Sequence, residues 1–367
     1  GMVEGAFNVG YVIAVPLLVA WTDRRDPRSI YLVATLLGIA ANLGLAWIAR
    51  DLWSAALFRG AAGIALAGTY MPGLKILTDS ITGPKQSRWL AFYTASFSLG
   101  ASLSTAATGA IGHHMDATAA FAFAGIGGVA AWLLIATATG SRPVEAHASA
   151  APWSAIWRAA QNRRALAYSL GYAAHMWELY GFRAWLVAYL LFAATGSLAP
   201  TGDTSFALWG AVLLFLGMPS SILGNEIALK IGRRRQLVLA MNISAALALA
   251  FGAGSLLPFP LLLAAGALYS LFVTADSASL TAGAVKHALP GQTGATMALH
   301  SLLGFAAASL GPLAFGLVLD IGGDHAAGAW FAGFGMLAIG VACGPLILRT
   351  MLGADDDVKR GKPDPQA

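Results

Sequence analysis

The sequence contains little charge and almost no cysteine. Of its 367 residues, 11% are Asp, Glu, Lys or Arg, against roughly 25% in an average soluble protein. A majority, 57%, are hydrophobic, and the mean hydropathy is +0.68. So little charge cannot cover the surface of a water-soluble globule. The composition therefore indicates a helical protein that crosses a lipid bilayer several times.

Other absences exclude whole classes of chemistry. The single cysteine, Cys343, lies in an apolar run, which excludes a disulfide framework and a cysteine-based metal site. The sequence has no Walker lysine in a phosphate loop, no Gly-x-Ser-x-Gly elbow and no nucleic-acid-binding module. We therefore expect neither an enzyme nor a bound cofactor, and no direct use of ATP. No cleavable signal peptide is visible, because the first apolar run leads directly into a charged loop.

Long apolar runs are what the sequence has in abundance. Each is near or above the about 20 residues that a helix needs to cross the hydrocarbon core. We expect eleven membrane spans, at residues 1–22, 30–49, 54–75, 89–111, 118–140, 165–195, 205–229, 236–255, 258–285, 293–319 and 328–348.

The basic residues fall on one side of these expected spans. If the loop from Asp23 to Arg28 is cytoplasmic and the spans alternate, 19 of the 22 Lys and Arg residues lie inside or at the inner interface. Only Arg50 lies outside, while Arg59 and Arg183 lie within spans. Cytoplasmic loops carry such an excess of positive charge. The pattern predicts a multi-pass protein of the cell inner (plasma) membrane with a cytoplasmic C-terminus.

The chain divides into two halves that repeat each other. We expect an N-terminal helical bundle at 1–140, a cytoplasmic linker with an interfacial helix at 141–164, a C-terminal bundle at 165–350 and a cytoplasmic tail at 351–367. An offset of 206 residues carries Asp26 to Gly232 and Pro84 to Pro290. Internal repeats of this kind are common in transporters. The offset maps 165–195 to positions before residue 1, so we expect a further span upstream and twelve in the intact protein.

The sixth expected span holds the densest group of ionisable side chains. A charged group at bilayer depth costs about 2.5–3.5 kcal/mol on insertion scales, so such residues usually serve a solute pathway. The alternative is a salt-bridged patch that only packs helices together. The candidate pathway residues in this span are His175, Trp177, Glu178, Tyr180 and Arg183.

Three further ionisable residues lie within other expected spans. Asp276 precedes Lys286 by ten residues, which places it about 15 Å from the membrane surface and near the midplane. His300 is shallower, and its alternative is a packing histidine with satisfied hydrogen bonds. Arg59 lies nearer the outer surface, where snorkelling of its side chain is an equal alternative to a pathway role.

A loop signature occurs twice, once in each half. The stretch from Val19 to Arg28 resembles the signature Gly-x-x-x-Asp-Arg-x-Gly-Arg-Lys of the major facilitator superfamily, with both glycines replaced. The second copy runs from Asn225 to Arg234 and has Leu229 in place of the aspartate. The resemblance covers essentially the whole chain. It implies an all-α membrane protein with two pseudo-symmetric six-helix bundles, of which eleven spans are present here.

The resemblance also implies a conformational latch, in which the acid caps a neighbouring helix and pairs with arginines across the loop. Glu226 lies at the expected inner mouth and is interpreted as a gate. The fourth-helix signature Arg-x-x-x-Gly stands as Arg59 to Gly63, with Ala62 in place of the family's glutamine. The expected latch residues are Asp23, Arg24, Arg28, Glu226, Gly232, Arg233 and Arg234.

These features predict a monomeric secondary transporter that works by alternating access, as a symporter or an antiporter. We expect a small anion as solute because Arg183 and Arg59 offer planar forks to carboxylate-like groups. Glu178 is expected to carry a proton, with His175 as a relay. The pathway arginine resembles that of nitrate or cyanate porters, whose glycine-rich signature is absent. Alternatives are a drug or metabolite efflux proton antiporter, a passive channel and a non-transporting membrane scaffold.

Overall fold

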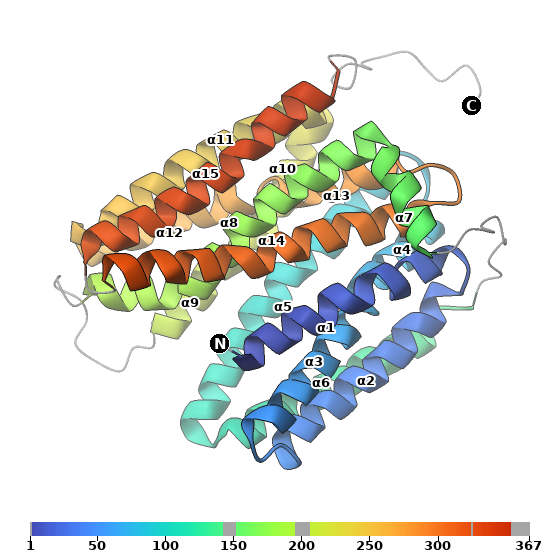
Figure 1. The fold of residues 1–367 in the computed structure, drawn as a ribbon, viewed down its shortest axis with the longest axis horizontal. Coiled ribbons are helices and arrows are strands. Elements are labelled where there is room, and N and C mark those ends of the chain that lie inside the picture. Colours follow the sequence, from blue (N-terminus) through green and yellow to red (C-terminus); the bar gives the residue numbers. More distant parts are fainter. Residues whose placement is uncertain (1, 142–151, 195–205, 324–325, 354–367) are drawn as a thin grey trace.

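The protein is described here from a computed structural model that covers residues 2–141, 152–194, 206–323 and 326–353. Within these ranges the chain is helical and contains no strand, which confirms the all-α class. The expected tail at 351–367 and most of the linker lie outside the described residues. Figure 1 labels the helices.

Three helices of the first half of the chain begin at side-chain caps. Asp26 accepts the backbone N–H of Arg28 at the start of α2, Asp51 forms a capping box with Ser54 at the start of α3, and Asp116 caps α6. These residues satisfy N–H groups that have no partner within the helix. The elements are α1 Met2–Leu18, η1 Ala20–Asp23, α2 Pro27–Trp47, α3 Leu52–Ala67, α4 Tyr70–Ser80, η2 Gly83–Lys85, α5 Gln86–His114 and α6 Ala117–Ala138.

A short helix, α7, precedes the helices of the second half. Within this half, the turn between α10 and α11 needs a glycine, because Gly232 has φ +94°, which other residues rarely adopt. The remaining elements are α7 Pro152–Gln161, α8 Arg163–Ala194, α9 Phe206–Phe215, α10 Gly217–Ile231, α11 Arg233–Gly252, η3 Ala253–Leu256, α12 Phe259–Thr274, α13 Ser277–Lys286, α14 Thr293–Gly322 and α15 Ala327–Met351.

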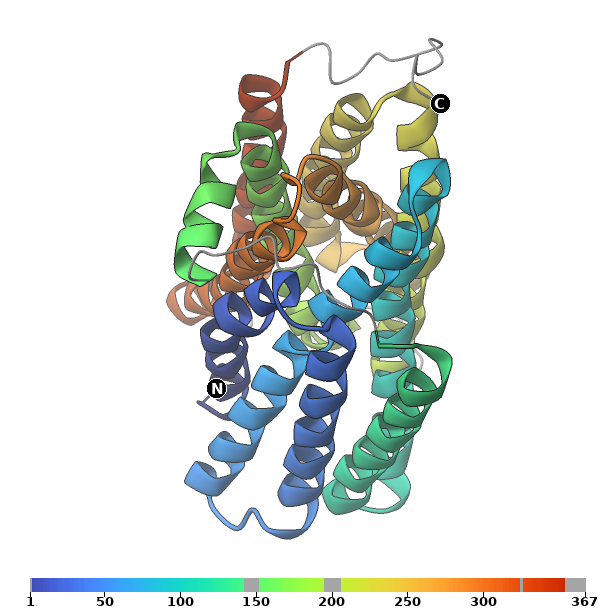
Figure 2. The ribbon, with the colours of Figure 1, turned by 90° about the vertical axis from the view of Figure 1, so that its right-hand side faces the viewer.

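Most helix packing occurs within each half of the chain. α3 packs on α1 and α2, and α2 also packs on α6, whereas α8 packs on α14 and α15, and α15 on α11. Contacts between the halves run from α5 to α9, α10 and α13, and from α1 to α14. Figures 1 and 2 show α1, α2, α3 and α6 on one side of the molecule and α8, α11, α14 and α15 on the other.

Two long helices are interrupted at corresponding points of the two halves. The helical stretch 52–80 breaks at Gly68 and Thr69, between α3 and α4, and the stretch 259–286 breaks at Ala275 and Asp276, between α12 and α13. The offset of 206 carries Thr69 to Ala275. Broken helices at membrane depth occur where the freed backbone borders a site or a cavity.

Among the residues that the structure describes, eight helical stretches are long and apolar enough to cross a bilayer. The expected spans 54–75, 89–111 and 165–195 coincide with α3 and α4, α5 and α8, which are helical but more polar. The protein is therefore a multi-pass membrane protein, and the count of eleven spans stays a prediction.

The interfacial helix expected in the linker corresponds to α7. Ala155, Ile156 and Ala159 are buried against the protein, while Trp153 and Trp157 are exposed on the opposite face. The helix contacts α1 and η1 of the first half and α8 and α14 of the second. The linker helix thus touches both halves of the molecule.

Candidate functional site

A small cavity lies where the two halves meet. Tyr70, Phe97 and Ser98 line it from α4 and α5, and residues of α8, α10, α12, α13 and α14 complete its wall. Its volume is about 20 Å³, which is enough for about one water molecule. A solute larger than water does not fit in the cavity in this arrangement of the halves.

Arg183 supplies the cation of this cavity. Its Nη2 donates to Ser98 Oγ at 3.2 Å, across the boundary between the halves. Its guanidinium lies 5.4 Å from the ring centre of Phe97 and 5.9 Å from that of Tyr180. Its Nε is buried and has no hydrogen-bond partner. The cavity therefore holds a guanidinium that has aromatic neighbours, one hydroxyl partner and unused donor capacity.

Glu178 lies apart from Arg183, so the structure does not form the Glu178–Arg183 bridge that the sequence left open. The carboxylate accepts hydrogen bonds from Ser244 Oγ at 2.9 Å and from Tyr269 OH at 3.1 Å. Glu178 is 1% exposed. Its hydrogen-bond partners are neutral hydroxyls from α11 and α12, not a basic group.

His175 and Asp276 form the second buried ionisable pair. His175 Nδ1 lies 2.8 Å from Asp276 Oδ1, within ion-pair distance. The two atoms are not aligned for a hydrogen bond, so the contact is electrostatic whenever the imidazole is protonated. Asp276 lies at the break between α12 and α13, and His175 lines the cavity. The broken helix thus brings a carboxylate next to a histidine that lines the cavity.

Tyr180 lines the cavity, but two other candidates lie elsewhere. Trp177 is on another face of α8, where its Nε1 donates to Met336 O at 3.4 Å. His300 stacks on Tyr172 at 4.0 Å between ring centres. The nitrogens of His300 lie 3.4 Å from the hydroxyls of Ser169 and Thr281. This environment matches the packing alternative for His300.

Arg59 lines a separate cavity of about 310 Å³ between α1, α2, α3 and α6. Its guanidinium lies over the ring of Phe7, at 4.7 Å from the ring centre. Neither residue contributes to the cavity at Arg183. The two arginines that the sequence placed on one pathway therefore occupy different sites.

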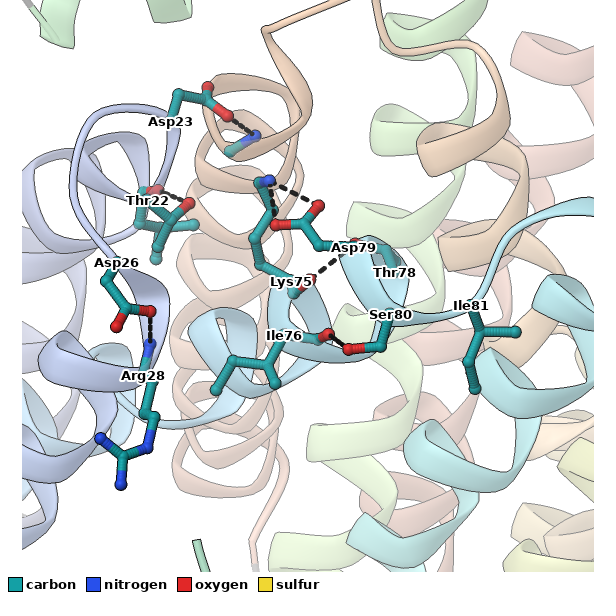
Figure 3. A network of polar contacts seen from close by, with 12 residues as sticks. Thr22, Asp23, Asp26, Arg28, Lys75, Ile76, Thr78, Asp79, Ser80 and Ile81 are labelled. Carbon is teal, nitrogen blue, oxygen red and sulfur yellow. Dashed lines mark hydrogen bonds and ion pairs between the residues drawn. The ribbon is translucent and has the colours of Figure 1, made fainter. Parts of the chain in front are cut away.

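Asp23 joins the two halves at the loop after α1. Its Oδ1 accepts the N–H of Gly294 at 2.7 Å and its Oδ2 accepts that of Ala295 at 2.8 Å. Figure 3 shows Asp23 and one hydrogen bond to its carboxylate. Both N–H groups belong to the first turn of α14, where free donors and the helix dipole favour an anion. Within the described ranges, Asp23 bonds to backbone N–H groups rather than to an arginine. The contact thus has the helix cap that the resemblance implies, without the arginine pairing.

Arg28 and Arg24 occupy different environments. Arg28 donates from Nη2 to Ala136 O at 2.7 Å and from Nε to Thr139 Oγ1 at 3.2 Å, which closes the end of α6. Figure 3 shows the hydrogen bond that the backbone N–H of Arg28 donates to the Asp26 side chain. Arg24 has a buried Nη2 without a hydrogen-bond partner.

The second copy of the loop signature also contacts the first half. Arg233 donates to Ser279 O at 2.9 Å and to Ser87 Oγ at 3.1 Å. Glu226 binds Arg88 through two bonds of 2.8 and 3.0 Å. Arg234, in the first turn of α11, has its Nη1 3.5 Å from the carbonyl oxygen of Gly353, just after α15. Two bridges between the halves therefore lie on the same side as the Asp23 contact.

Several residues of the site escaped the sequence reasoning. Ser98, Ser244 and Tyr269 have no charge, so their roles depend on which helix faces which. Tyr269 offers one signal, since tyrosine in a span usually lies near an interface, and a central one needs a partner for its hydroxyl.

Comparisons with known proteins agree on one family. The model of the Major Facilitator Superfamily matches residues 1–251. A curated relative, the "MFS-type transporter clz19" of Cochliobolus lunatus, is 28% identical over 132 residues, or 36% of this chain. That match spans 25% of the relative's own length.

Two solved structures share the fold. The human organic anion transporter MFSD10 (TETRAN) superposes with a TM-score of 0.75 at 17% identity, over 95% of this chain and 83% of that one. The E. coli fucose:proton symporter FucP superposes with a TM-score of 0.73 at 14% identity, over 96% and 91%. Since the family model covers well over half of the chain, this protein belongs to the Major Facilitator Superfamily of transporters.

Proposed function

We propose that the protein is a proton-coupled secondary transporter of a small anion, working by alternating access across the inner membrane. The observation that carries this proposal is the environment of Arg183. A guanidinium stays charged at all relevant pH values, and burying it without a counter-ion is costly. Its only hydrogen-bond partner within the described residues is Ser98 Oγ. A carboxylate-like solute would supply the missing negative charge in bidentate geometry.

The buried acids support proton coupling. Glu178 has hydroxyl partners and no basic partner, so a proton is the natural neutralising charge. Asp276 and His175, the second of which lines the cavity, can share a second proton. Because these acids do not bind Arg183, the arginine remains available for the solute.

The arrangement of the halves supports alternating access. The contacts of Asp23, Glu226 and Arg233 close one side, and the cavity is too small to be an open pore. The corresponding breaks in the two halves favour two pseudo-symmetric bundles that rock about the cavity. A passive channel would need no such bridges.

The names of the structural neighbours are compatible with this chemistry. One is described as an organic anion transporter and the other as a fucose:proton symporter. Their identity to this chain is too low to transfer a substrate, so the anion and the proton rest on Arg183 and Glu178.

The proposal is tested with purified protein in proteoliposomes that carry a pH gradient. We expect saturable, counterflow-competent uptake of members of a panel of mono- and dicarboxylates and inorganic oxyanions. Arg183→Lys keeps the charge but loses the fork, so uptake should fall sharply while the protein remains folded. Arg50→Lys, at an exposed loop end, is the matched control. Transport of a cationic solute combined with a silent Arg183→Lys would overturn the anion assignment.

A further inference from the structure

An apolar groove with a basic end lies on the surface of the first half. It is bordered by α1, η1 and α2, and Ile64 of α3 forms part of its floor. Its volume is about 610 Å³. Along α2 it extends from Ser29 to Leu37, about 12 Å by helix rise. Val33 and Trp21 line the groove and are exposed, so the groove opens to the surroundings of the protein.

Arg24 and Arg25 form the basic end of this groove. The Nη2 of Arg24 is buried without a hydrogen-bond partner, and leaving such a donor unsatisfied costs about 1–3 kcal/mol or more. Neither neighbouring acid neutralises these arginines within the described part of the chain. Asp23 binds the first turn of α14, and Asp26 caps α2 and accepts Ser141 Oγ. The groove end therefore has two cations that lack an anion.

The second half contains the same groove without the arginines. A cavity of about 310 Å³ lies between α10, α11 and α12. The offset of 206 carries Val33 to Leu239 and Leu37 to Ile243, both of which line this second cavity. It carries Arg25 to Ile231, also in the lining. The internal repeat thus preserves the apolar walls and has Ile231 where the first groove has Arg25, while it carries Arg24 to Lys230, which does not line the second cavity.

We infer that the groove at Arg24 and Arg25 binds one anionic phospholipid. The two arginines and Ser29 receive the phosphate, and an acyl chain lies along the apolar walls formed by Leu18, Val33 and Leu37. The groove begins at helix ends, which is where headgroups lie when these helices cross a membrane. A free phosphate would use the arginines but not the apolar walls, so the occupant is a lipid.

The test is native mass spectrometry of the full chain, purified in detergent with equal amounts of phosphatidylglycerol and phosphatidylethanolamine. We expect the wild type to retain phosphatidylglycerol selectively. An arginine near an anionic surface contributes about fivefold in affinity, so Arg25→Gln should lose about fivefold and the Arg24→Gln, Arg25→Gln double variant about 25-fold. Arg349→Gln, an exposed arginine in the last turn of α15, should retain the lipid as the wild type does.

A gain-of-function variant keeps the inference testable if the double variant misfolds. Ile231→Arg places a cation at the end of the second groove, and it should add a second retained phosphatidylglycerol. Glycerol 3-phosphate, the headgroup chemistry without acyl chains, should not displace the lipid. Equal retention by wild type and Arg25→Gln, no added lipid in Ile231→Arg, or full displacement by glycerol 3-phosphate would each overturn the inference.

Discussion

Replacing Asp23 by asparagine should favour opening of the side that Asp23 holds closed. The carboxylate accepts two N–H groups of α14, and a hydrogen bond to a charged group contributes about 1.5–3 kcal/mol. Asparagine keeps one acceptor oxygen and loses the charge that favours the helix N-terminus. The loss of about 1.5–3 kcal/mol corresponds to roughly a 10- to 150-fold shift between closed and open states.

The exposed bridge between Arg88 and Glu226 cannot compensate for this loss. The Arg88 and Glu226 side chains are 57% and 33% exposed, and exposed ion pairs contribute about 0–1 kcal/mol. Asp23 should therefore contribute more to the equilibrium on that side than the Arg88–Glu226 pair does. Its substitution should slow transport cycling more than it weakens solute binding, because the cavity residues are unchanged.

The assay is alkylation of a single cysteine placed in the cavity wall at Ser221, in a Cys343→Ser background. We expect the alkylation rate to rise about tenfold or more in Asp23→Asn when reagent is added from the side of the 23–28 loop. Asp26→Asn is the control, because Asp26 bonds only within the first half of the chain and asparagine also caps helices. Unchanged alkylation and unchanged transport in Asp23→Asn would refute the latch.

Four further outcomes are expected. Glu178→Gln should abolish proton-driven accumulation while sparing solute exchange across equal gradients, and accumulation against a gradient in this variant would remove its proton role. Glu226→Gln should change the alkylation rate less than Asp23→Asn does, about fivefold at most. Gly232→Ala should lower the thermal midpoint because its φ of +94° strains any other residue, a loss that Gly5→Ala should not show. Hydrogen bonds from the N–H groups of Ser54 and Trp53 lower the pKa of Asp51. Its contribution to stability is therefore present at neutral pH and lost as the pH falls through that lowered pKa. The difference in thermal midpoint between wild type and Asp51→Ala should disappear in acid.

The helical spans and the family could be predicted from the sequence because hydropathy and loop signatures are local properties. The buried ionisable residues between the halves could be named as candidates in the same way, because an ionisable side chain within an apolar span is visible in the sequence. Their partners could not, because Glu178 meets Tyr269 across 91 positions and Ser244 across 66. Such contacts depend on how the helices are rotated, which a single sequence does not specify.

Arg59 and Arg183 illustrate the same limit. Both are arginines within expected spans, and depth alone placed them on a shared pathway. The structure separates them because α3 turns Arg59 toward Phe7 while α8 turns Arg183 toward Ser98. Depth in the membrane could be estimated from helix rise, whereas the direction of each side chain required the packing of the neighbouring helices.

The position of α7 has a consequence for motion. Ala155, Ile156 and Ala159 anchor this helix by small apolar contacts, and its neighbours belong to both halves. If the halves separate on this side, α7 must stay with one of them and slide off the other. The linker helix would then disengage from one half each time the transporter opens. The rate at which trypsin cleaves the chain after Arg158 would report how often this happens.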